Sequence, residues 1–399
     1  MDNLSLQDFD YTLPDDRIAA FPLPERDASR LLVSESGKIT DRSFRDLPSL
    51  LPEGATLVFN DTRVIEARIH FQKPTGGIIE LFCLEPYQPS EMTTALQSEG
   101  PVRWRCLVGG ASKWKDGQVL AKQLEVLGES CTLEARLLSK EPDDYIVELR
   151  WSGGFPFAEV LHVAGAIPLP PYIRRAAQHS DAERYQTVFA RNEGSVAAPT
   201  AALHFTEHIL QQLEAAGVRR VPVTLNVGAG TFKPVKSETI SGHTMHAEHF
   251  SVTAATLRAL IEAGPIVAVG TTSLRTLESL YWLGVKTATS GSLQTELSQW
   301  EAYELDGQMN YRESITVVLR ELQKSVMEEV HCRTALLIRP GYQFRSADAL
   351  ITNFHQPRST LILLVAAFIG GNWRALYDHA LEEGYRFLSY GDSSLLWKK

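Results

Sequence analysis

Ile266-Val267-Ala268-Val269-Gly270-Thr271-Thr272-Ser273-Leu274-Arg275-Thr276 is the stretch that most directly indicates the fold of this chain. Its apolar start predicts a buried strand, its glycine and hydroxyl residues predict a turn, and the remainder has helical spacing. This is the ordinary connection of an α/β protein. It is also a place where free N–H groups and the helix dipole favour an anion, which Arg275 can help to clamp. The pattern alone leaves both interpretations open.

The chain from residue 151 onward alternates helical periods with strands. Thr206 is a suitable N-cap for a helix that Gly217 closes, and the helix after residue 270 has a suitable C-cap in Gly284. Short apolar segments at 220–225 and 265–269 are predicted strands. The sequence therefore predicts an α/β fold for this half.

Residues 65–150 have a different pattern, in which apolar and polar residues alternate in short runs. Turn signals such as Gly76-Gly77 and Asp116-Gly117 separate these runs. Such spacing is typical of a small antiparallel barrel or sandwich, and the polar segment 88–100 is expected to be a loop. We predict two domains: a larger mixed α/β domain, residues 1–63 and 152–399, and an inserted small antiparallel β-barrel domain, residues 64–151.

The composition argues against a general polyanion-binding protein. The chain has 399 residues and a formal net charge of −9, whereas such proteins are usually basic. A local basic patch remains open, and so does the simpler reading of solvated helix faces. The candidates for such a patch are Arg17, Arg26, Arg30, Arg174, Arg175, Arg184 and Arg191.

The four cysteines are widely spaced and form no CxxC motif, so they are expected to be reduced thiols. The N-terminus is polar and acidic, unlike a secretory signal. The longest apolar run, 361–369, is shorter than the roughly 20 residues that span a bilayer. We expect a cytoplasmic protein without a membrane segment.

Gly194-Ser195-Val196-Ala197-Ala198-Pro199-Thr200-Ala201-Ala202-Leu203-His204-Phe205-Thr206 carries no acidic or basic residue other than the one histidine. Its small residues let a ligand approach the backbone, and Thr200 and His204 can orient it.

The segment His243-Thr244-Met245-His246-Ala247-Glu248-His249-Phe250 invites a metal hypothesis, but the i,i+4 histidine pair of a helical metal site is missing. If the segment is a strand, His246 and Glu248 share one face. A carboxylate beside an imidazole suits general acid–base catalysis. A hydrogen-bonded surface strand is the alternative.

Three further polar segments follow predicted strands. In Ile351-Thr352-Asn353-Phe354-His355-Gln356-Pro357-Arg358-Ser359-Thr360, an extended backbone points Asn353 and His355 to one side, and Ser359 can cap the next helix. The segments 60–63, with Asp61 and Arg63, and 390–392, with Asp392, admit a ligand site or a structural turn.

The common cofactor loops are missing from the sequence, which contains no GxGxxG, GxxxxGK[ST] or GxSxG. Gly228-Ala229-Gly230-Thr231 is too short to be specific. Rossmann and P-loop functions are therefore disfavoured.

These segments, in this order, resemble the S-adenosylmethionine:tRNA ribosyltransferase-isomerase family of the queuosine pathway. The matching segments are 8–14, 26–32, 60–65, 75–77, 168–173, 184–189, 195–205, 227–232, 243–248, 270–278, 352–361 and 390–392. The chain departs from the family pattern at three places. Asn226 replaces a histidine, Ala202 a glycine, and Ser393-Ser394 an Ala-Met pair.

The resemblance implies a cleft between an α/β domain and a β-barrel. It also implies a reaction: S-adenosylmethionine gives its ribosyl part to 7-aminomethyl-7-deazaguanine (preQ1) at the wobble position of tRNA. Adenine and methionine leave, and epoxyqueuosine remains in the tRNA. The family needs no metal or other cofactor, and we expect a monomer or weak homodimer.

Roles for individual residues follow as hypotheses. A base must remove a C5′ proton that the sulfonium acidifies, and His246 assisted by Glu248 is the first candidate, His355 the second. Asp61 or His204 is the candidate acid for the departing adenine. The remaining candidates bind substrate, and the first four of them hold the methionine carboxylate: Thr271, Thr272, Ser273, Arg275, Asn353, Thr200, Arg63 and Asp392.

Two alternatives stay open at this stage. One is a non-catalytic tRNA- or nucleoside-binding paralogue of the same fold, because the chain departs from the family pattern. The other is a metal-dependent hydrolase built on His243, His246 and His249.

Overall fold

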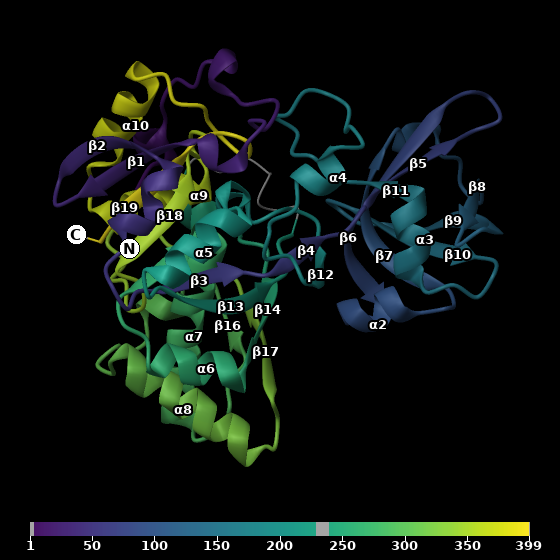
Figure 1. Ribbon diagram of the computed structural model, residues 1–399. Helices are drawn as coiled ribbons and strands as arrows, with labels where there is room; N and C mark the ends of the chain where they lie inside the picture. Colours follow the sequence, from purple (N-terminus) through teal and green to yellow (C-terminus); the bar gives the residue numbers. More distant parts are fainter. Residues whose placement is uncertain (1–3, 229–238, 399) are drawn as a thin grey trace.

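A computed structural model describes residues 4–228 and 239–398, and its centre is a ten-stranded sheet in the order β16-β17-β14-β13-β3-β15-β18-β19-β1-β2 (Figure 1). These strands are β1 Arg30–Glu35, β2 Lys38–Ser43, β3 Thr56–Asn60, β13 Arg219–Leu225, β14 Glu248–Thr253, β15 Ile266–Val269, β16 Glu296–Leu297, β17 Glu329–Thr334, β18 Ala349–Asn353 and β19 Ser393–Trp397. The helices that pack against this sheet are α1 Leu47–Leu50, α5 Glu207–Ala215, α6 Ala254–Ile261, α7 Gly270–Ser290, α8 Tyr311–Lys324, α9 Thr360–Ile369 and α10 Trp373–Glu382.

Four neighbouring strands in the middle of this sheet, β13, β3, β15 and β18, are parallel. Their carboxyl ends therefore lie at one edge of the sheet, which we call the carboxyl edge. In open α/β sheets, ligands bind outside this edge. The strands beside the parallel group, β14 and β19, are antiparallel to their neighbours β13 and β18.

Alternating side chains of the central strands build a core on each face of the sheet. Val58, Ala268 and Leu350 belong to the core that α6 to α10 cover, whereas Val267 and Ile351 belong to the core that includes α1 and α5. Strands buried on both faces have the continuous apolar sequences seen here. The result is a three-layer α/β arrangement.

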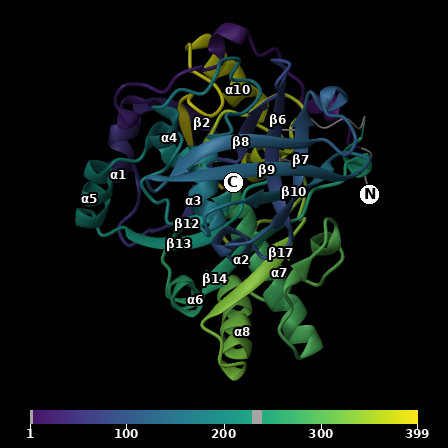
Figure 2. The same ribbon diagram turned by 90° about the vertical axis from the view of Figure 1, so that its right-hand side faces the viewer.

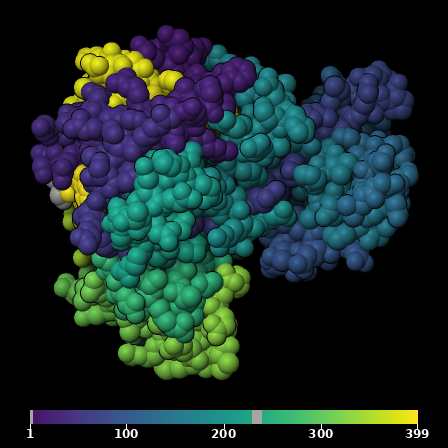
Figure 3. Space-filling view, viewed as in Figure 1, coloured from purple at the N-terminus to yellow at the C-terminus, as the bar shows by residue number. Residues whose placement is uncertain are grey.

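Residues 65–166 form a β-rich lobe, which projects from the main body of the molecule (Figures 1 and 3). Its curled, seven-stranded antiparallel sheet has the order β11-β5-β6-β7-β10-β9-β8, and β8, β9 and β10 run side by side in Figure 2. Trp104 and Phe157 lie in its own core. Its elements are β5 Arg68–Gln72, β6 Ile78–Gln88, α2 Met92–Gln97, β7 Val102–Gly109, β8 Val119–Val126, β9 Glu129–Lys140, β10 Tyr145–Trp151, α3 Phe157–Ala164 and β11 Gly165–Ala166.

Several short elements lie outside the two large sheets. They are β4 Thr62–Val64, α4 Asp181–Arg184, β12 Asn192–Ser195 and a 3-10 turn at Thr200–His204. β4 and β12 pair in parallel.

Two predicted helix starts are confirmed. The Thr206 hydroxyl accepts a hydrogen bond from Ile209 N at 3.3 Å, and the Ser359 hydroxyl accepts one from Ile362 N at 3.3 Å. Both hydroxyls satisfy a backbone donor that the first turn leaves free.

Three local predictions are wrong. Gly284 does not end α7, which continues to Ser290. A Cβ at Gly284 would lie 2.0 Å from Ser314 Oγ, so this glycine permits the close approach of α7 and α8. Segment 88–100 contains helix α2, capped by Glu91. Residues 243–247 are not in a strand, because β14 begins at Glu248.

Among the described residues, no single helix is long and apolar enough to cross a membrane. The helices α9 and α10 reach that length and apolarity only as a pair, and they are bent by 110° relative to one another.

Candidate active site

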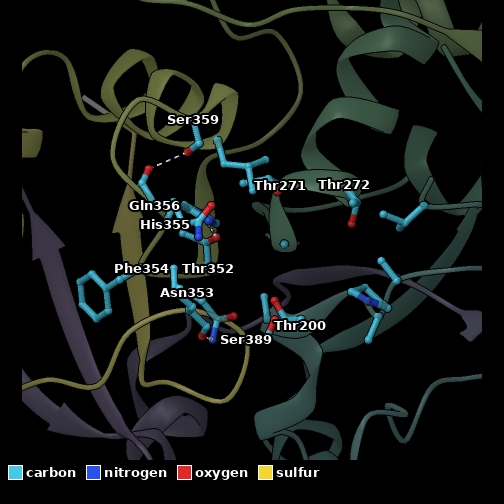
Figure 4. A pocket seen from close by; sticks show the side chains of 18 of the residues that line it. Thr200, Thr271, Thr272, Thr352, Asn353, Phe354, His355, Gln356, Ser359 and Ser389 are labelled. Atoms are coloured by element: carbon cyan, nitrogen blue, oxygen red, sulfur yellow. Dashed lines mark hydrogen bonds between the residues drawn. The ribbon is translucent and has the colours of Figure 1, made fainter. Parts of the chain in front are cut away.

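Three hollows adjoin one another at the carboxyl edge of the central sheet. The inner cavity, of about 80 Å³, is shown in Figure 4. Its polar lining residues are Tyr172, Thr200, Thr271, Thr272, Thr352, Asn353, His355, Gln356, Ser359 and Ser389. The interlobe cleft is larger, about 580 Å³, and takes residues from the β-rich lobe and from β13, β14 and β17. A side cavity of about 30 Å³ is lined by Arg275 and shares Thr271, Thr272 and Leu361 with the inner cavity.

Val227 lines both the inner cavity and the interlobe cleft, and it follows the end of β13. The segment 194–206 holds Val227 in place through two hydrogen bonds. Val227 N donates to Ser195 Oγ at 2.7 Å, and Val196 N donates to Val227 O at 3.1 Å. The next residues of this segment form a wall of the inner cavity with Thr200. Val227 therefore belongs to the wall that the interlobe cleft and the inner cavity share. The motif residues 229–232 lie outside the described residues.

The N-terminus of α7 faces the inner cavity. Gly270 has φ +87°, a conformation that favours glycine, and a Cβ there would lie 3.6 Å from the Cβ of Ala201. The first N–H groups of a helix have no partner within the helix. Thr272 lies across the cavity from His355 (Figure 4), and its Oγ1 is buried without a hydrogen-bond partner in residues 4–228 and 239–398.

Ser273 is not part of this surface. It is fully buried, its Oγ donates to Val269 O at 2.7 Å, and it lines none of the three hollows. The helical turn points it back toward β15, so its predicted contact with a ligand carboxylate is not supported.

Glu248 and Arg275 form a buried ion pair, with side chains 7% and 12% exposed. Glu248 Oε1 also accepts a hydrogen bond from Gly228 N at 3.0 Å. Burial lowers the pKa of Arg275 to about 10, and its Nε has no hydrogen-bond partner in the described part of the chain. Because Glu248 lines the interlobe cleft and Arg275 the side cavity, the pair lies between the two.

His246 is exposed, and no hydrogen bond or ion pair among the described residues joins it to Glu248. The predicted pairing of these residues on one strand face fails because β14 starts only at Glu248. Burial and the neighbouring His246 lower the pKa of His243. Residues 4–228 and 239–398 contain no group of three or more His, Cys, Asp or Glu side chains placed to hold a metal ion.

His355, at the end of β18, lines the inner cavity as predicted for a site residue. Its Nε2 lies 3.0 Å from Thr352 Oγ1, and its main-chain N donates to Tyr377 Oη at 3.0 Å. Burial lowers the pKa of His355 to about 3. The imidazole is therefore neutral at physiological pH.

Asn353 also lines the inner cavity, but His204 lies behind it and outside the lining. Asn353 Nδ2 donates to His204 Nε2 at 3.2 Å. Burial lowers the pKa of His204 to about 3. His204 therefore supports Asn353 and does not itself face the cavity.

Asp61, Arg63 and Asp392 line none of the three hollows. Asp61 is buried and accepts hydrogen bonds from Thr224 Oγ1 at 2.6 Å and Asn192 Nδ2 at 3.1 Å, and burial raises its pKa. Asp392 accepts the main-chain N–H groups of Arg30 and Arg386. Arg63 is exposed and pairs with Glu193 at 3.6 Å. Asp61 and Asp392 therefore anchor a turn and a strand end, which is the structural alternative that the sequence left open.

Sequence reasoning missed Val227, Tyr172 and Ser389 as lining residues. Tyr172 Oη and Ser389 Oγ lie 2.6 Å apart, although 217 residues separate them in the chain. Tyr172 belongs to a matched motif, 168–173, but nothing in its local pattern indicates where it packs.

The residues that depart from the family pattern are all accommodated. Ser394 Oγ and Ser393 Oγ donate to Thr352 O at 2.9 and 3.4 Å. Ala202 is buried in the core behind the inner cavity wall. Asn226 Oδ1 accepts a hydrogen bond from Thr62 Oγ1 at 3.3 Å and lines the interlobe cleft.

The sheet and the helices that cover it define a protein of the α/β class, with polar cavities at the carboxyl edge of the sheet. Residues 6–396 match the family described as queuosine biosynthesis protein, and this chain belongs to that family. The family that the sequence resembles is thereby confirmed.

Named relatives are similar over nearly the whole chain. The S-adenosylmethionine:tRNA ribosyltransferase-isomerase of Anaeromyxobacter sp. (strain Fw109-5) is 44% identical over 400 residues, 98% of this chain and 99% of the relative. That of Azoarcus sp. (strain BH72) is 40% identical over 398 residues, 98% and 97%. A crystal structure of S-adenosylmethionine tRNA ribosyltransferase from Thermotoga maritima is 29% identical, with a TM-score of 0.46, and covers 97% of this chain and 99% of that one.

Proposed function

We propose that this protein is an S-adenosylmethionine:tRNA ribosyltransferase-isomerase. It transfers and isomerises the ribosyl part of S-adenosylmethionine onto 7-aminomethyl-7-deazaguanine at the wobble position of tRNA, with loss of adenine and methionine. Relatives with this name, at 40 to 44% identity over nearly the full chain, support the proposal. Their name is that of an enzyme, and nothing favours a non-catalytic paralogue.

The observation that carries the proposal is that Val227 lines both a small polar cavity and a large cleft. A reaction between a nucleoside and a macromolecule needs two such spaces that meet at the reacting atoms. The inner cavity, at about 80 Å³, is too small for a whole S-adenosylmethionine. We place the adenine in it, with the ribose and sulfonium toward Val227.

The methionine end is bound at the Glu248–Arg275 pair in this arrangement. Arg275 has an unpartnered Nε and lies one turn beyond the N-terminus of α7. A guanidinium and free helix N–H groups are both suited to a carboxylate. Thr271 and Thr272 line the path between the inner and side cavities.

The tRNA enters by the interlobe cleft. Arg105 and Tyr87 line it on the lobe side, and Arg333 lines it on the main body. Aromatic and basic side chains are the usual partners of an unstacked base and its phosphates. We place two domains on either side, with the lobe extending from about residue 64 to 166, because α3 and β11 pack in the lobe beyond the expected boundary at 151. A monomer or weak homodimer and a cytoplasmic location remain part of the proposal.

Glu248 is our candidate for the base that removes the C5′ proton, and His355 is the second. Glu248 is the carboxylate on the main-body wall of the cleft, close to Val227 through its bond to Gly228. His355 is neutral and able to accept a proton, but its low pKa makes it a weak base. His246 is exposed and becomes the third candidate. We assign positioning roles to the other two candidates: His204 holds Asn353, and Asp61 holds Thr224.

The test is a reaction with purified protein, S-adenosylmethionine and tRNA that carries 7-aminomethyl-7-deazaguanine. We expect epoxyqueuosine in the digested tRNA, with one adenine and one methionine released for each modified base. A folded protein that binds S-adenosylmethionine but releases no adenine in the presence of this tRNA contradicts the proposal.

A further inference from the structure

The Asn353 side chain has one half bound and one half free. Its Nδ2 group donates to His204 Nε2 at 3.2 Å and to Leu388 O at 3.2 Å, and it lies 3.5 Å from Asp392 O. Its Oδ1 has no hydrogen-bond partner in the described residues, although Asn353 is only 3% exposed. A buried acceptor without a donor is unfavourable unless a ligand supplies the donor.

The orientation of this amide is fixed by its neighbours. Leu388 O and Asp392 O are main-chain carbonyls, which only accept hydrogen bonds, so the amide half that faces them must be the NH₂ group. The His204 imidazole is held neutral by burial and forms a hydrogen bond with the Arg26 main chain. Its Nε2 is therefore the acceptor for Asn353. Oδ1 is therefore the half of the amide that is buried without a donor, on a residue that lines the inner cavity.

The position of Asn353 relates it to one end of the substrate proposed above. Asn353 lines the inner cavity but not the side cavity, where Arg275 lies. If the methionine carboxylate is held at Arg275, the opposite end of the molecule, the adenine, is near Asn353. Ala198, Pro199 and Leu388 also line the inner cavity, and their apolar surfaces suit the face of a flat ring.

Adenine carries one group at its edge that donates hydrogen bonds when the base is attached to ribose, the exocyclic amine. We propose that Asn353 Oδ1 accepts a hydrogen bond from this amine, and that His204 holds the amide in the orientation that makes the site selective for 6-aminopurines over 6-oxopurines. This inference rests on the proposed function. An oxo group at the same place would put two acceptors face to face, and sites built for a hydrogen bond discriminate strongly against such analogues.

Two ligands that differ only at this group test the proposal. The affinities of S-adenosylhomocysteine and S-inosylhomocysteine for the wild-type protein are measured by calorimetry, without tRNA. We expect the amino ligand to bind about tenfold or more tightly than the oxo ligand. Equal affinities overturn the proposal, and this comparison needs no variant to fold.

Two variants then assign the preference to its residues. Asn353→Ala should reduce the preference to near one by weakening the amino ligand alone. His204→Leu, which removes the acceptor that orients the amide, should reduce it as well, while His204→Gln, which keeps an acceptor, should restore part of it. Asn372→Ala, at an exposed amide away from the cavity, is the matched control and should keep the full preference. A preference that survives in a folded Asn353→Ala protein also overturns the proposal.

The experiments distinguish a failure of the Asn353 proposal from a failure of the proposed function. If the wild-type protein forms epoxyqueuosine in tRNA but binds the two ligands equally, the role of Asn353 is wrong and the reaction stands. If it neither forms product nor binds S-adenosylhomocysteine, both are wrong.

Discussion

Glu248 on β14 and Arg275 on α7 form an ion pair between the interlobe cleft and the side cavity, where both side chains are nearly buried. A buried ion pair contributes little net stability, because desolvation of the two charges offsets their attraction. Removal of one partner is different, since it leaves an uncompensated buried charge. Arg275 has a further donor, Nε, that no described residue uses. We infer that the pair holds a guanidinium ready for a second carboxylate, that of the substrate.

Arg275→Gln tests this role in binding. Because the variant loses a charge-assisted hydrogen bond of roughly 1.5–3 kcal/mol, the KM for S-adenosylmethionine should rise about 10- to 100-fold. Steady-state release of adenine at saturating tRNA measures the change. Arg63→Gln, at an exposed arginine that lines none of the hollows, is the control and should leave KM unchanged. An unaltered KM in Arg275→Gln would show that the methionine end binds elsewhere.

Glu248→Gln tests the same pair from its other side. The neutral side chain leaves the Arg275 charge uncompensated, which should lower the free energy of unfolding by about 3–5 kcal/mol. A ligand carboxylate replaces the missing charge, so S-adenosylhomocysteine should raise the Tm of the variant by more than it raises that of the wild-type protein. Thermal unfolding with and without ligand measures both the loss of stability and the ligand-induced rise in Tm.

The control for Glu248→Gln is Glu25→Gln, which breaks the exposed pair with Arg45. An exposed pair contributes at most about 1 kcal/mol, so this variant should keep the stability and the ligand response of the wild-type protein. Equal ligand-induced shifts in Tm for Glu248→Gln and wild type would contradict the exchange of carboxylates at Arg275.

Burial of His204 and His355 makes the folded protein sensitive to acid. Burial lowers the pKa of each histidine from 6.5 to about 3. Below pH 6.5 these two histidines therefore bind protons in the unfolded chain but stay neutral in the folded protein. The free energy of unfolding therefore falls as the pH falls, by about 2 kcal/mol for each histidine between pH 6.5 and 4.5. Urea unfolding at a series of pH values should show a smaller loss in His355→Gln than in wild type. His331→Gln, at an exposed histidine, should keep the wild-type slope, and a common slope for all three proteins would refute the assignment.

The parts of the site that the sequence predicted correctly are those set by neighbours in the chain. The turn at Gly270 and the cap at Ser359 follow from residues within four positions, and a strand that ends in Asn353 needs only its own apolar run. The same local reasoning failed where contacts with distant segments determine the structure. A glycine at position 284 looks like a helix end until Ser314 is seen against it.

Local sequence patterns also fail to predict which residues of the site contact one another. Glu248 is two residues from His246 in the chain, yet its partner is Arg275, which the fold brings across from another element. Ser273 lies between two residues predicted to bind substrate, but the helical turn points it at Val269. No pattern within either segment specifies these contacts, because they depend on the packing of α7 against the sheet.

The base assignment can be decided by comparing His246→Ala with Glu248→Gln. His246 is exposed and Glu248 lines the cleft beside Val227, so we expect His246→Ala to keep kcat within about threefold of wild type. Loss of a general base costs typically 10²- to 10⁴-fold, and Glu248→Gln should lose kcat by about that factor. Single-turnover formation of epoxyqueuosine at saturating S-adenosylmethionine separates this loss from weaker binding, and circular dichroism confirms that each variant is folded. If His246→Ala is inactive while Glu248→Gln retains its rate, the exposed imidazole is the base, and the Glu248 carboxylate serves only to hold Arg275.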